Sequence, residues 1–332
     1  MKWERLGKRN ISRFLQTYSC FIILLGLIIV SGALSDKFLS QQNIFNVLRQ
    51  QAHIAILALG ALIVILTGGI DLSSGAILGI SNVFVAYFIT NLALDSMGGA
   101  AISIITAILA GGLAGFINGL LIAYLSMPAF IATLASMTML RGVALVMTNG
   151  TPIRPPVDPL ANPGSFALFR FGQDSDPLIG MPWPVWVTVV IVAFFWFLMK
   201  YTTFGRLTMA TGSNEDATRL AGINVKMYKT AAYTLCGLLA GVAGVLLAAR
   251  AGIAIPAAGS GQELTSIAAV VIGGASLSGG SGKVANTIVG VFILALIGNI
   301  MTLLAIPAYP QQIIEGAIII AAVFLNRGKK KK

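Results

Sequence analysis

The chain has 332 residues, of which 57% are hydrophobic and only 10% are charged, against roughly 25% charged in an ordinary soluble domain. A soluble fold cannot bury so much apolar surface, whereas a helix of about 20 apolar residues satisfies its own backbone hydrogen bonds in a bilayer. The formal net charge of +11 does not indicate a nucleic-acid partner, because most basic residues lie in short segments beside apolar runs. The composition predicts an all-α polytopic membrane protein, with residues 1–332 as one transmembrane domain.

The first part of the chain, residues 18–148, contains five apolar runs of spanning length. They lie near residues 18–34, 52–70, 76–94, 100–125 and 129–148. The first run follows a basic stretch, as a signal peptide does, but no convincing cleavage site follows it, so we expect a retained helix. Basic residues flank both ends of the set of apolar runs, which predicts that both termini are cytoplasmic. These residues are Lys2, Arg5, Lys8, Arg9 and Arg13 before the first run, and Arg327 and Lys329 to Lys332 after the last.

The second part of the chain, residues 183–326, contains five further runs. They lie near residues 183–199, 230–250, 262–280, 284–305 and 311–326, and the third of them is weak and interrupted by glycine. That run could be a full crossing or a re-entrant element. We therefore expect about ten transmembrane helices, an even number that agrees with two cytoplasmic termini.

Two polar segments between the runs agree with this orientation. Residues 149–182 are rich in proline, and their three aspartates outnumber their two arginines, which predicts a periplasmic loop. Residues 200–229 carry an excess of basic side chains, which predicts a cytoplasmic loop.

Two glycine-rich segments resemble each other. Gly68 to Gly75 reads GGIDLSSG and Gly273 to Gly280 reads GGASLSGG, and a weaker echo pairs Pro128-Ala129-Phe130 with Pro307-Ala308-Tyr309. Corresponding glycine-interrupted segments indicate an internal repeat whose broken helices line a transport site, although chance similarity is an alternative in a glycine-rich chain. The candidate residues of the translocation path are Gly68, Gly69, Asp71, Ser73, Gly75, Gly273, Gly274, Ser276 and Ser278, together with Asn118 and Asn299.

No catalytic or metal-binding arrangement is predicted. His53 is the one histidine, so neither a Ser-His-Asp triad nor a two-histidine metal site can form. The stretch from Gly279 to Lys283 is glycine-rich like a phosphate-binding loop, but Leu277 replaces the first glycine of that motif and Val284 replaces its hydroxyl residue. We expect no cofactor on this chain, and if transport is driven by ATP, the ATPase must be another chain.

Five ionisable residues lie in or beside the apolar runs, where charge is costly and commonly functional. They are Asp71, Arg141, Arg250, Glu263 and Glu315. Asp71 could bind a polar solute or accept the free N–H groups of a broken helix, and we favour the second role. Arg141 lies well inside the fifth run, so we expect a buried ion pair whose partner the sequence does not identify. The scattered positions do not indicate a proton relay.

A short amphipathic helix is predicted in the cytoplasmic loop. Gly212 to Val225 reads GSNEDATRLAGINV, with small apolar residues on one face and charged residues on the other. The pattern fits either a solvated loop helix or a helix that docks to a motor protein. The candidate coupling residues are Asn214, Glu215, Asp216, Ala217, Arg219, Leu220, Gly222 and Ile223.

With these motifs in order along nearly the whole chain, the sequence resembles the ribose-type permease family of bacterial ABC importers. The family motif Gly-Gly-Ile-Asp-Leu-Ser-Val-Gly matches Gly68 to Gly75, with Ser74 in place of valine. The sequence departs from the family pattern at Thr265, which replaces an aspartate, and at Ser266, which replaces an alanine. The other matching segments are Phe130 to Leu134, Leu140 to Val143, Thr148 to Gly150, Gly212 to Val225, Glu263-Leu264, Ile267 to Val271 and Gly273-Gly274.

The resemblance implies the partners and the task of the chain. It implies a bacterial inner-membrane core of two permease subunits, identical or closely related, a cytoplasmic tandem-cassette ATPase that binds ATP and Mg²⁺, and a periplasmic sugar-binding protein. It also implies that residues 214–223 form the coupling helix and that the cargo is a monosaccharide, with ribose or a similar pentose or hexose expected first. Deoxysugars, furanosides and nucleosides stay open, as do two other classes of protein: an ion-coupled secondary sugar transporter and a non-transporting membrane scaffold.

Overall fold

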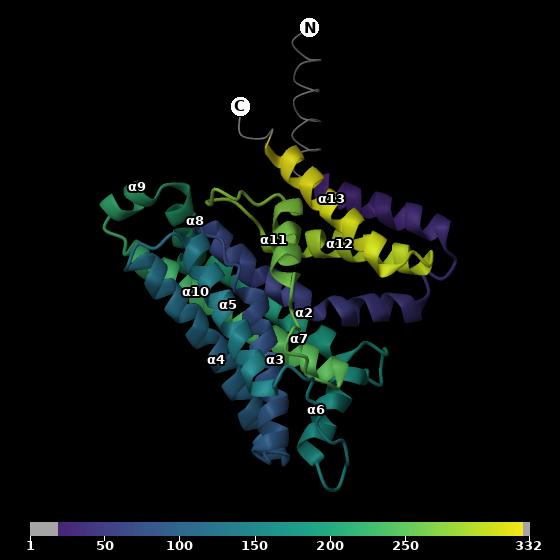
Figure 1. The fold of residues 1–332 in the computed structure, drawn as a ribbon. Coiled ribbons are helices and arrows are strands. Elements are labelled where there is room, and N and C mark those ends of the chain that lie inside the picture. Colours follow the sequence, from purple (N-terminus) through teal and green to yellow (C-terminus); the bar gives the residue numbers. More distant parts are fainter. Residues whose placement is uncertain (1–18, 328–332) are drawn as a thin grey trace.

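The computed structural model describes residues 19–327, which fold into helices joined by short segments (Figure 1). Within this range there is no strand, only two isolated backbone bridges. A first helix, Ser19–Leu34, precedes α2 (Gln41–Leu66), α3 (Ser74–Asn91), α4 (Met97–Ala123), α5 (Ala129–Thr148), α6 (Pro163–Gln173), α7 (Trp183–Tyr201), α8 (Thr203–Ser213), α9 (Glu215–Leu220), α10 (Val225–Ala251), α11 (Gln262–Ile272), α12 (Val284–Leu303) and α13 (Ala308–Arg327).

Several helices begin at a polar cap. The Ser40 hydroxyl accepts the N–H of Asn43 at the start of α2, and the Ser96 hydroxyl accepts the N–H of Gly99 at the start of α4. Such caps satisfy N–H groups that have no partner inside the helix. With Ser40 as its cap, α2 begins well before residue 52, where the apolar run was predicted to start. The apolar run did not reveal this beginning, because the first turns of the helix are polar.

Seven of the described helices are long and apolar enough to cross a bilayer: α2, α3, α4, α5, α7, α10 and α12. The predicted class, an all-α polytopic membrane protein, is therefore confirmed. The ten predicted spans are not all of this kind, since helix Ser19–Leu34 and α11 are apolar but shorter. The last predicted run, near residues 311–326, lies within α13.

The eighth predicted run, near residues 262–280, is not one helix. α11 has 11 residues, which at 1.5 Å per residue is roughly 16 Å, about half of the hydrocarbon thickness of a bilayer. It ends at Gly273 and is followed by Gly274, whose φ of +89° lies in the left-handed region. The expected glycine interruption is thus a true helix end, and α11 alone is too short to cross a bilayer.

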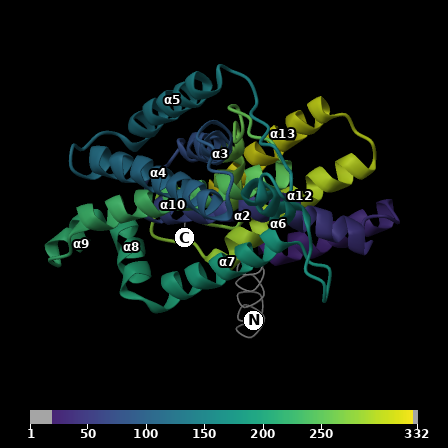
Figure 2. The ribbon, with the colours of Figure 1, turned by 90° about the horizontal axis from the view of Figure 1, so that it is seen from below.

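α10 lies at the centre of the fold, where it packs against α4, α2 and α3 (Figure 2). Glycines bring α4 and α10 into backbone contact. A Cβ atom on Gly111 would lie 2.6 Å from the carbonyl oxygen of Gly237, and one on Gly115 would lie 2.2 Å from that of Tyr233. Small residues allow this close approach between membrane helices. Replacing either glycine would therefore force the two backbones apart.

The two polar loops lie at opposite ends of the molecule. α8 and α9, in the predicted cytoplasmic loop, lie at the top of Figure 1, whereas α6, in the predicted periplasmic loop, lies at the bottom. The sequence did not predict α6, because its proline-rich surroundings suggested irregular structure.

In the same loop, the N–H groups of Ala161 and Leu160 donate to Asp158 and lower the pKa of its carboxyl.

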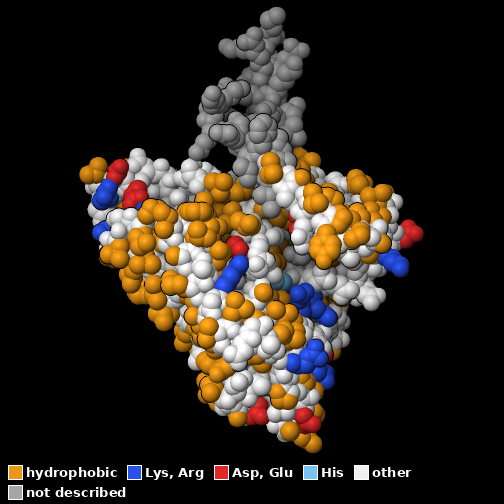
Figure 3. Space-filling view, in the orientation of Figure 1, with side chains coloured by type: hydrophobic (Ala, Val, Ile, Leu, Met, Phe, Trp, Pro, Cys, Tyr) orange, Lys and Arg blue, Asp and Glu red, His pale blue; other side chains and the backbone are white. Residues whose placement is uncertain are grey.

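The outer surface of the molecule is apolar over wide areas. Exposed leucine, isoleucine and valine side chains cover the outward faces of α4, α5 and α7, including Leu109, Leu113, Val146 and Val190. Figure 3 shows these areas in orange on one side of the molecule, with few charged side chains among them. Such large apolar patches are expected where a helix faces lipid.

Candidate functional site

The two glycine-rich segments both lie in breaks between helices. Residues 67–73 separate α2 from α3, and residues 273–283 separate α11 from α12. Left-handed φ angles occur at Gly68, Gly274, Gly279 and Gly280, a conformation that glycine adopts without strain. In the first motif the left-handed residue of the Gly-Gly pair is its first glycine, Gly68, whereas in the second motif it is the second glycine, Gly274. The similarity in sequence therefore does not extend to the local backbone conformation.

The two segments lie in contact although they are far apart in the sequence. The N–H of Gly280 donates to the carbonyl oxygen of Leu66 at 3.0 Å. A Cβ atom on Gly279 would lie 2.9 Å from the backbone nitrogen of Gly68. The structure therefore brings together the two groups of residues that the sequence predicted for one path.

Gly212, at the end of α8, fills the space between these two segments. A Cβ atom at this position would lie 1.9 Å from the carbonyl oxygen of Leu66 and 2.7 Å from the backbone nitrogen of Gly280. The predicted cytoplasmic loop is thus in direct backbone contact with the end of α2 and with the second glycine-rich segment. The sequence reasoning did not include Gly212 among the coupling candidates, because one more glycine in this chain carries no distinctive signal.

α9 is the short amphipathic helix predicted in the cytoplasmic loop. The Asn214 side chain caps it by accepting the N–H of Ala217 at 2.9 Å, and Glu215 forms an ion pair with Lys229 of α10 at 2.5 Å. Arg219 pairs with Asp216 on the helix itself. Leu220 is 88% exposed, so this chain leaves the most apolar side chain of the helix uncovered.

The remaining coupling candidates lie around the end of α9. Gly222 has a φ of +80°, a left-handed conformation, directly after the helix. Ile223 lines a cavity of about 720 Å³ between α9, the start of α10 and the first glycine-rich segment. Other residues around this cavity are Gly68, Gly69, Asn214, Arg219, Lys229 and Ser278. Half of the coupling candidates and part of the predicted path therefore face one space.

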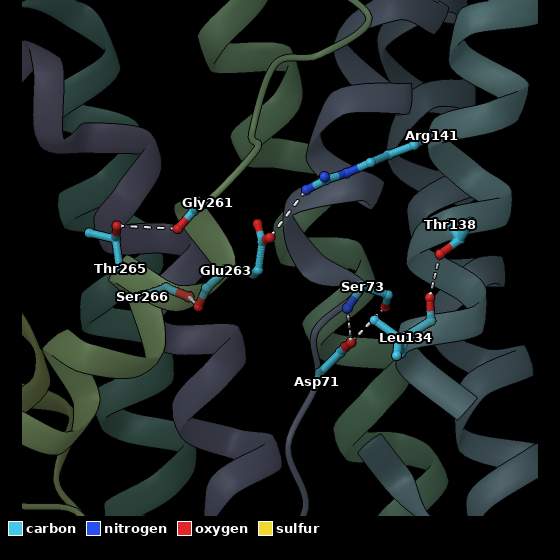
Figure 4. A network of polar contacts seen from close by, with 9 residues as sticks. All are labelled: Asp71, Ser73, Leu134, Thr138, Arg141, Gly261, Glu263, Thr265 and Ser266. Carbon is cyan, nitrogen blue, oxygen red and sulfur yellow. Dashed lines mark hydrogen bonds and ion pairs between the residues drawn. The ribbon is translucent and has the colours of Figure 1, made fainter. Parts of the chain in front are cut away.

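Asp71 belongs to a buried polar network at the start of α3. Its Oδ1 atom accepts the N–H of Ser73 at 2.8 Å and the Ser73 hydroxyl at 2.6 Å (Figure 4). The side chain of Asn118, in α4, donates to the Ser73 hydroxyl at 2.9 Å. Asp71 thus accepts one N–H group of the break before α3, and Asn118 belongs to the same network.

The predicted ion pair of Arg141 is present, and its partner is Glu263. Arg141 of α5 and Glu263 of α11 approach to 3.1 Å (Figure 4). A Cβ atom on Gly75 would lie 2.0 Å from Oε2 of Glu263, so only glycine at this position of α3 leaves room for the carboxylate. Figure 3 shows a hollow on this face, in which charged side chains lie between two apolar areas.

Three other predicted residues lie outside this network. Asn299 of α12 exchanges two hydrogen bonds of 2.9 Å with Asn43 of α2. Ser276 and Ser278 form a hydrogen bond of 2.8 Å with each other in the segment before α12. Thr265, where the sequence departs from the family pattern, donates to the carbonyl oxygen of Gly261 at 3.3 Å (Figure 4).

The described residues include no group of three histidine, cysteine, aspartate or glutamate side chains placed to bind a metal ion. His53 is buried within α2. The region therefore combines close backbone contacts between distant segments, a cavity and an exposed short helix beside it.

Comparison with known proteins gives one consistent result. Residues 43–323 match the family described as branched-chain amino acid transport system / permease component. The chain is 38% identical over 325 residues to the ribose import permease protein RbsC of Escherichia coli, covering 98% of each chain. It is 41% identical over 315 residues to the ribose import permease protein of Bacillus subtilis, covering 95% of this chain and 94% of the relative.

A relative with another named sugar is also similar. The chain is 34% identical over 319 residues to the D-allose transport system permease protein of Escherichia coli, covering 96% of this chain and 94% of the relative. No solved structure matches the chain significantly.

Proposed function

The chain belongs to this permease family, as a ribose-type ABC importer permease of the bacterial inner membrane, and from this premise we propose that it carries a monosaccharide into the cell. The names of its relatives specify ribose and D-allose, so ribose is the first expected cargo and other pentoses and hexoses follow. The chain is the transport subunit and not an enzyme of sugar chemistry.

The contact made by Gly212 is the observation that carries the mechanism. It places the loop that contains α9 against the end of α2, directly before the first glycine-rich segment, and against the second glycine-rich segment. We propose that a partner ATPase, which binds ATP and Mg²⁺, moves α9, and that α8 passes this movement to the breaks at residues 67–73 and 273–283. The passage would then open alternately to the two sides of the membrane.

The proposed assembly contains three partners. A second permease subunit, identical or closely related, completes the membrane core, a tandem-cassette ATPase docks on α9, and a periplasmic sugar-binding protein delivers the cargo. Residues 1–332 act as one permease domain within it. Tight binding in the passage would slow release, so we expect most of the affinity for sugar to lie in the binding protein.

Reconstitution tests this function against an ion-coupled transporter. Proteoliposomes would contain the permease with its ATPase, and the sugar-loaded binding protein would be added outside. We expect uptake of labelled D-ribose that stops when ATP is omitted and persists when a protonophore collapses the proton gradient. Uptake that follows the proton gradient without ATP would replace the proposal with secondary transport, and no flux of any solute would favour a scaffold.

Shortening Leu220 and Arg219 to alanine together should separate ATP hydrolysis from transport. The side chain of Leu220 is 88% exposed, and burying a leucine side chain at an interface is worth about 1.5–3 kcal/mol. We therefore expect sugar-stimulated ATPase activity to fall by about tenfold or more, with normal expression. Leu160→Ala is the matched control, because this side chain is also exposed but lies in the loop at the opposite end. Equal activity in the two variants would contradict the docking of α9.

We further propose that α9 and both termini face the cytoplasm and that the three remaining apolar helices complete ten membrane-embedded elements. Residues 1–18 and 328–332, on which the basic flanks depend, lie outside the described residues. In intact cells, a cysteine in place of Asp216 should resist a membrane-impermeant thiol reagent and react after lysis. A cysteine in place of Leu160 should react in intact cells. The reverse pattern would invert the orientation.

A further inference from the structure

A second polar cavity lies away from the coupling region, between α2, α11, α12 and α13. Its volume is about 350 Å³, which is within the range of small-molecule pockets. The polar side chains around it include Gln50, Thr265, Asn299, Thr302, Gln311 and Glu315. These side chains come from four helices that are separated in the sequence, so the fold gathers them at one place.

The position of this cavity along α2 separates it from the cavity beside α9. Leu66, at the end of α2, contacts Gly280 in the coupling region. Gln50 precedes Leu66 by 16 positions, a rise of roughly 24 Å along a helix. The two polar cavities therefore lie toward opposite ends of α2, an arrangement that fits two successive polar sites along one transport path.

Two further cavities in the same structure are apolar. One lies between α2, α7 and α12 and is lined mainly by alanine, valine and isoleucine. The other lies between α4, α6 and α10 and has a similar lining. Hydrocarbon chains can fill such spaces, whereas amides and carboxylates in membrane helices are costly and need polar partners. The lining of the cavity at Gln50 thus differs in kind from that of a lipid crevice.

Some of the polar side chains are held in place by the protein. Asn299 bonds to Asn43 at 2.9 Å, Gln311 donates to the carbonyl oxygen of Ile306 at 2.8 Å, and the Thr302 hydroxyl donates to that of Gly298 at 2.9 Å. The side chains of Gln50, Gln51 and Glu315, by contrast, form no hydrogen bond with any described residue. Three polar side chains thus remain available to a ligand beside fixed ones, although Gln51 also borders the apolar cavity between α2, α7 and α12.

The chemistry of the lining selects a class of ligand. A glutamine amide offers donors and an acceptor, and a carboxylate offers strong acceptors, which together match the adjacent hydroxyl groups of a sugar. Among the side chains that the structure describes, no lysine or arginine lines the cavity, so these residues offer an anionic solute no counter-charge. Val47, Ile54 and Leu294 supply an apolar wall, which suits the C–H face of a sugar ring.

We propose that this cavity is a sugar subsite within the permease, in which Gln50 and Glu315 bind the hydroxyl groups of the passing monosaccharide. The proposal rests on the proposed function, since it gives the transported solute a resting place inside the membrane core. Asn299 and Gln311, which are held by their own hydrogen bonds, line the same cavity.

Transport per ATP hydrolysed tests the subsite in the reconstituted complex. Gln50→Leu keeps the size of the side chain and removes its hydrogen bonds, and Glu315→Gln removes the charge. Losing a hydrogen bond to the sugar should lower the number of D-ribose molecules moved per ATP by about threefold to tenfold in each variant. ATPase activity stimulated by the binding protein should stay within about twofold of the wild-type value, because hydrolysis depends on the distant α9.

Controls separate this role from packing and from the proposed function. Gln312→Leu makes the same chemical change at an exposed neighbour outside the cavity and should leave transport unchanged, whereas Gln50→Asn should retain part of it. Unchanged transport in Gln50→Leu and Glu315→Gln, or an equal loss of ATPase activity, would overturn the subsite. A wild-type complex that moves neither D-ribose nor D-allose would instead refute the proposed function.

Thiol labelling distinguishes a sugar subsite from a lipid or subunit contact. With Cys20 and Cys236 replaced by serine, Gln50→Cys should react with a small hydrophilic methanethiosulfonate, and sugar turnover should slow the reaction. Reaction only with a lipid-soluble maleimide would assign the cavity to lipid. A disulfide between two copies of the permease at this position would assign it to the subunit interface, and either result would overturn the proposal.

Discussion

Replacing Gly212 with alanine should nearly abolish sugar uptake while the helices remain folded. The added Cβ atom would lie 1.9 Å from the carbonyl oxygen of Leu66 and 2.7 Å from the nitrogen of Gly280. Both are backbone atoms, so relief requires the α8 end to move away from the glycine-rich segments. Overpacking of this kind costs about 1–3 kcal/mol or more, and a penalty of this size on the coupled state would lower coupled transport by about fivefold to 150-fold.

The reconstituted complex provides the measurement, as D-ribose uptake and ATPase activity stimulated by the binding protein. Gly142→Ala is the matched control, because this glycine lies in α5 and a Cβ atom there would meet nothing within 4 Å. We expect wild-type uptake from that variant. Circular dichroism would show whether both proteins are folded. Full uptake by folded Gly212→Ala protein would remove the contact between the loop and the two segments from the mechanism.

The second large effect is expected on stability, from Glu263→Gln. Breaking a buried ion pair by removing one partner costs about 3–5 kcal/mol, because the remaining charge is left without compensation. The side chain of Arg141 is 32% exposed, so water or a headgroup screens part of its charge. We therefore expect a loss of about 3 kcal/mol in the free energy of unfolding, at the lower end of that range.

The partner variants test whether the charge is responsible. Arg141→Met in the Glu263→Gln background removes both charges and should recover much of the lost stability, since apolar replacements of buried pairs are often neutral. Asp174→Asn breaks the exposed pair with Arg170 and should cost less than about 1 kcal/mol. Unfolding in a mixed detergent titration would measure all variants. Similar losses for Asp174→Asn and Glu263→Gln would contradict the role of burial.

The sequence predicted most of the apolar helices because a segment in a bilayer must satisfy its backbone within itself. The runs near residues 76–148 and 183–199 therefore match α3, α4, α5 and α7 in existence and order. The polar start of α2 and the helix α6 were missed, because polar residues can form helices at a water boundary that hydropathy does not reveal. The weak run near residues 262–280 was predicted to be interrupted by glycine. The interruption is the end of α11, whose C-cap residue is Gly273.

The candidate site was predictable only where its contacts are local. The amphipathic pattern within Gly212 to Val225 indicated α9, because the two faces of a helix are set by residues close together in sequence. The partner of Arg141 lies 122 positions away, and sequence shows only that a buried charge needs a partner. Packing decides such pairs, as it decides the contact of Gly212, whose neighbours come from two other segments.

The glycine contacts between α4 and α10 restrict how the permease can change shape. At Gly111 and Gly115, a Cβ atom would lie only 2.6 Å or less from a carbonyl oxygen of α10. Two backbones packed this closely cannot slide past each other without steric overlap. We therefore expect this helix pair to move as one rigid unit. Under the proposed mechanism, the bending would fall outside the pair, at the breaks at residues 67–73 and 273–283, and α4 and α10 would keep their relative position while the passage opens.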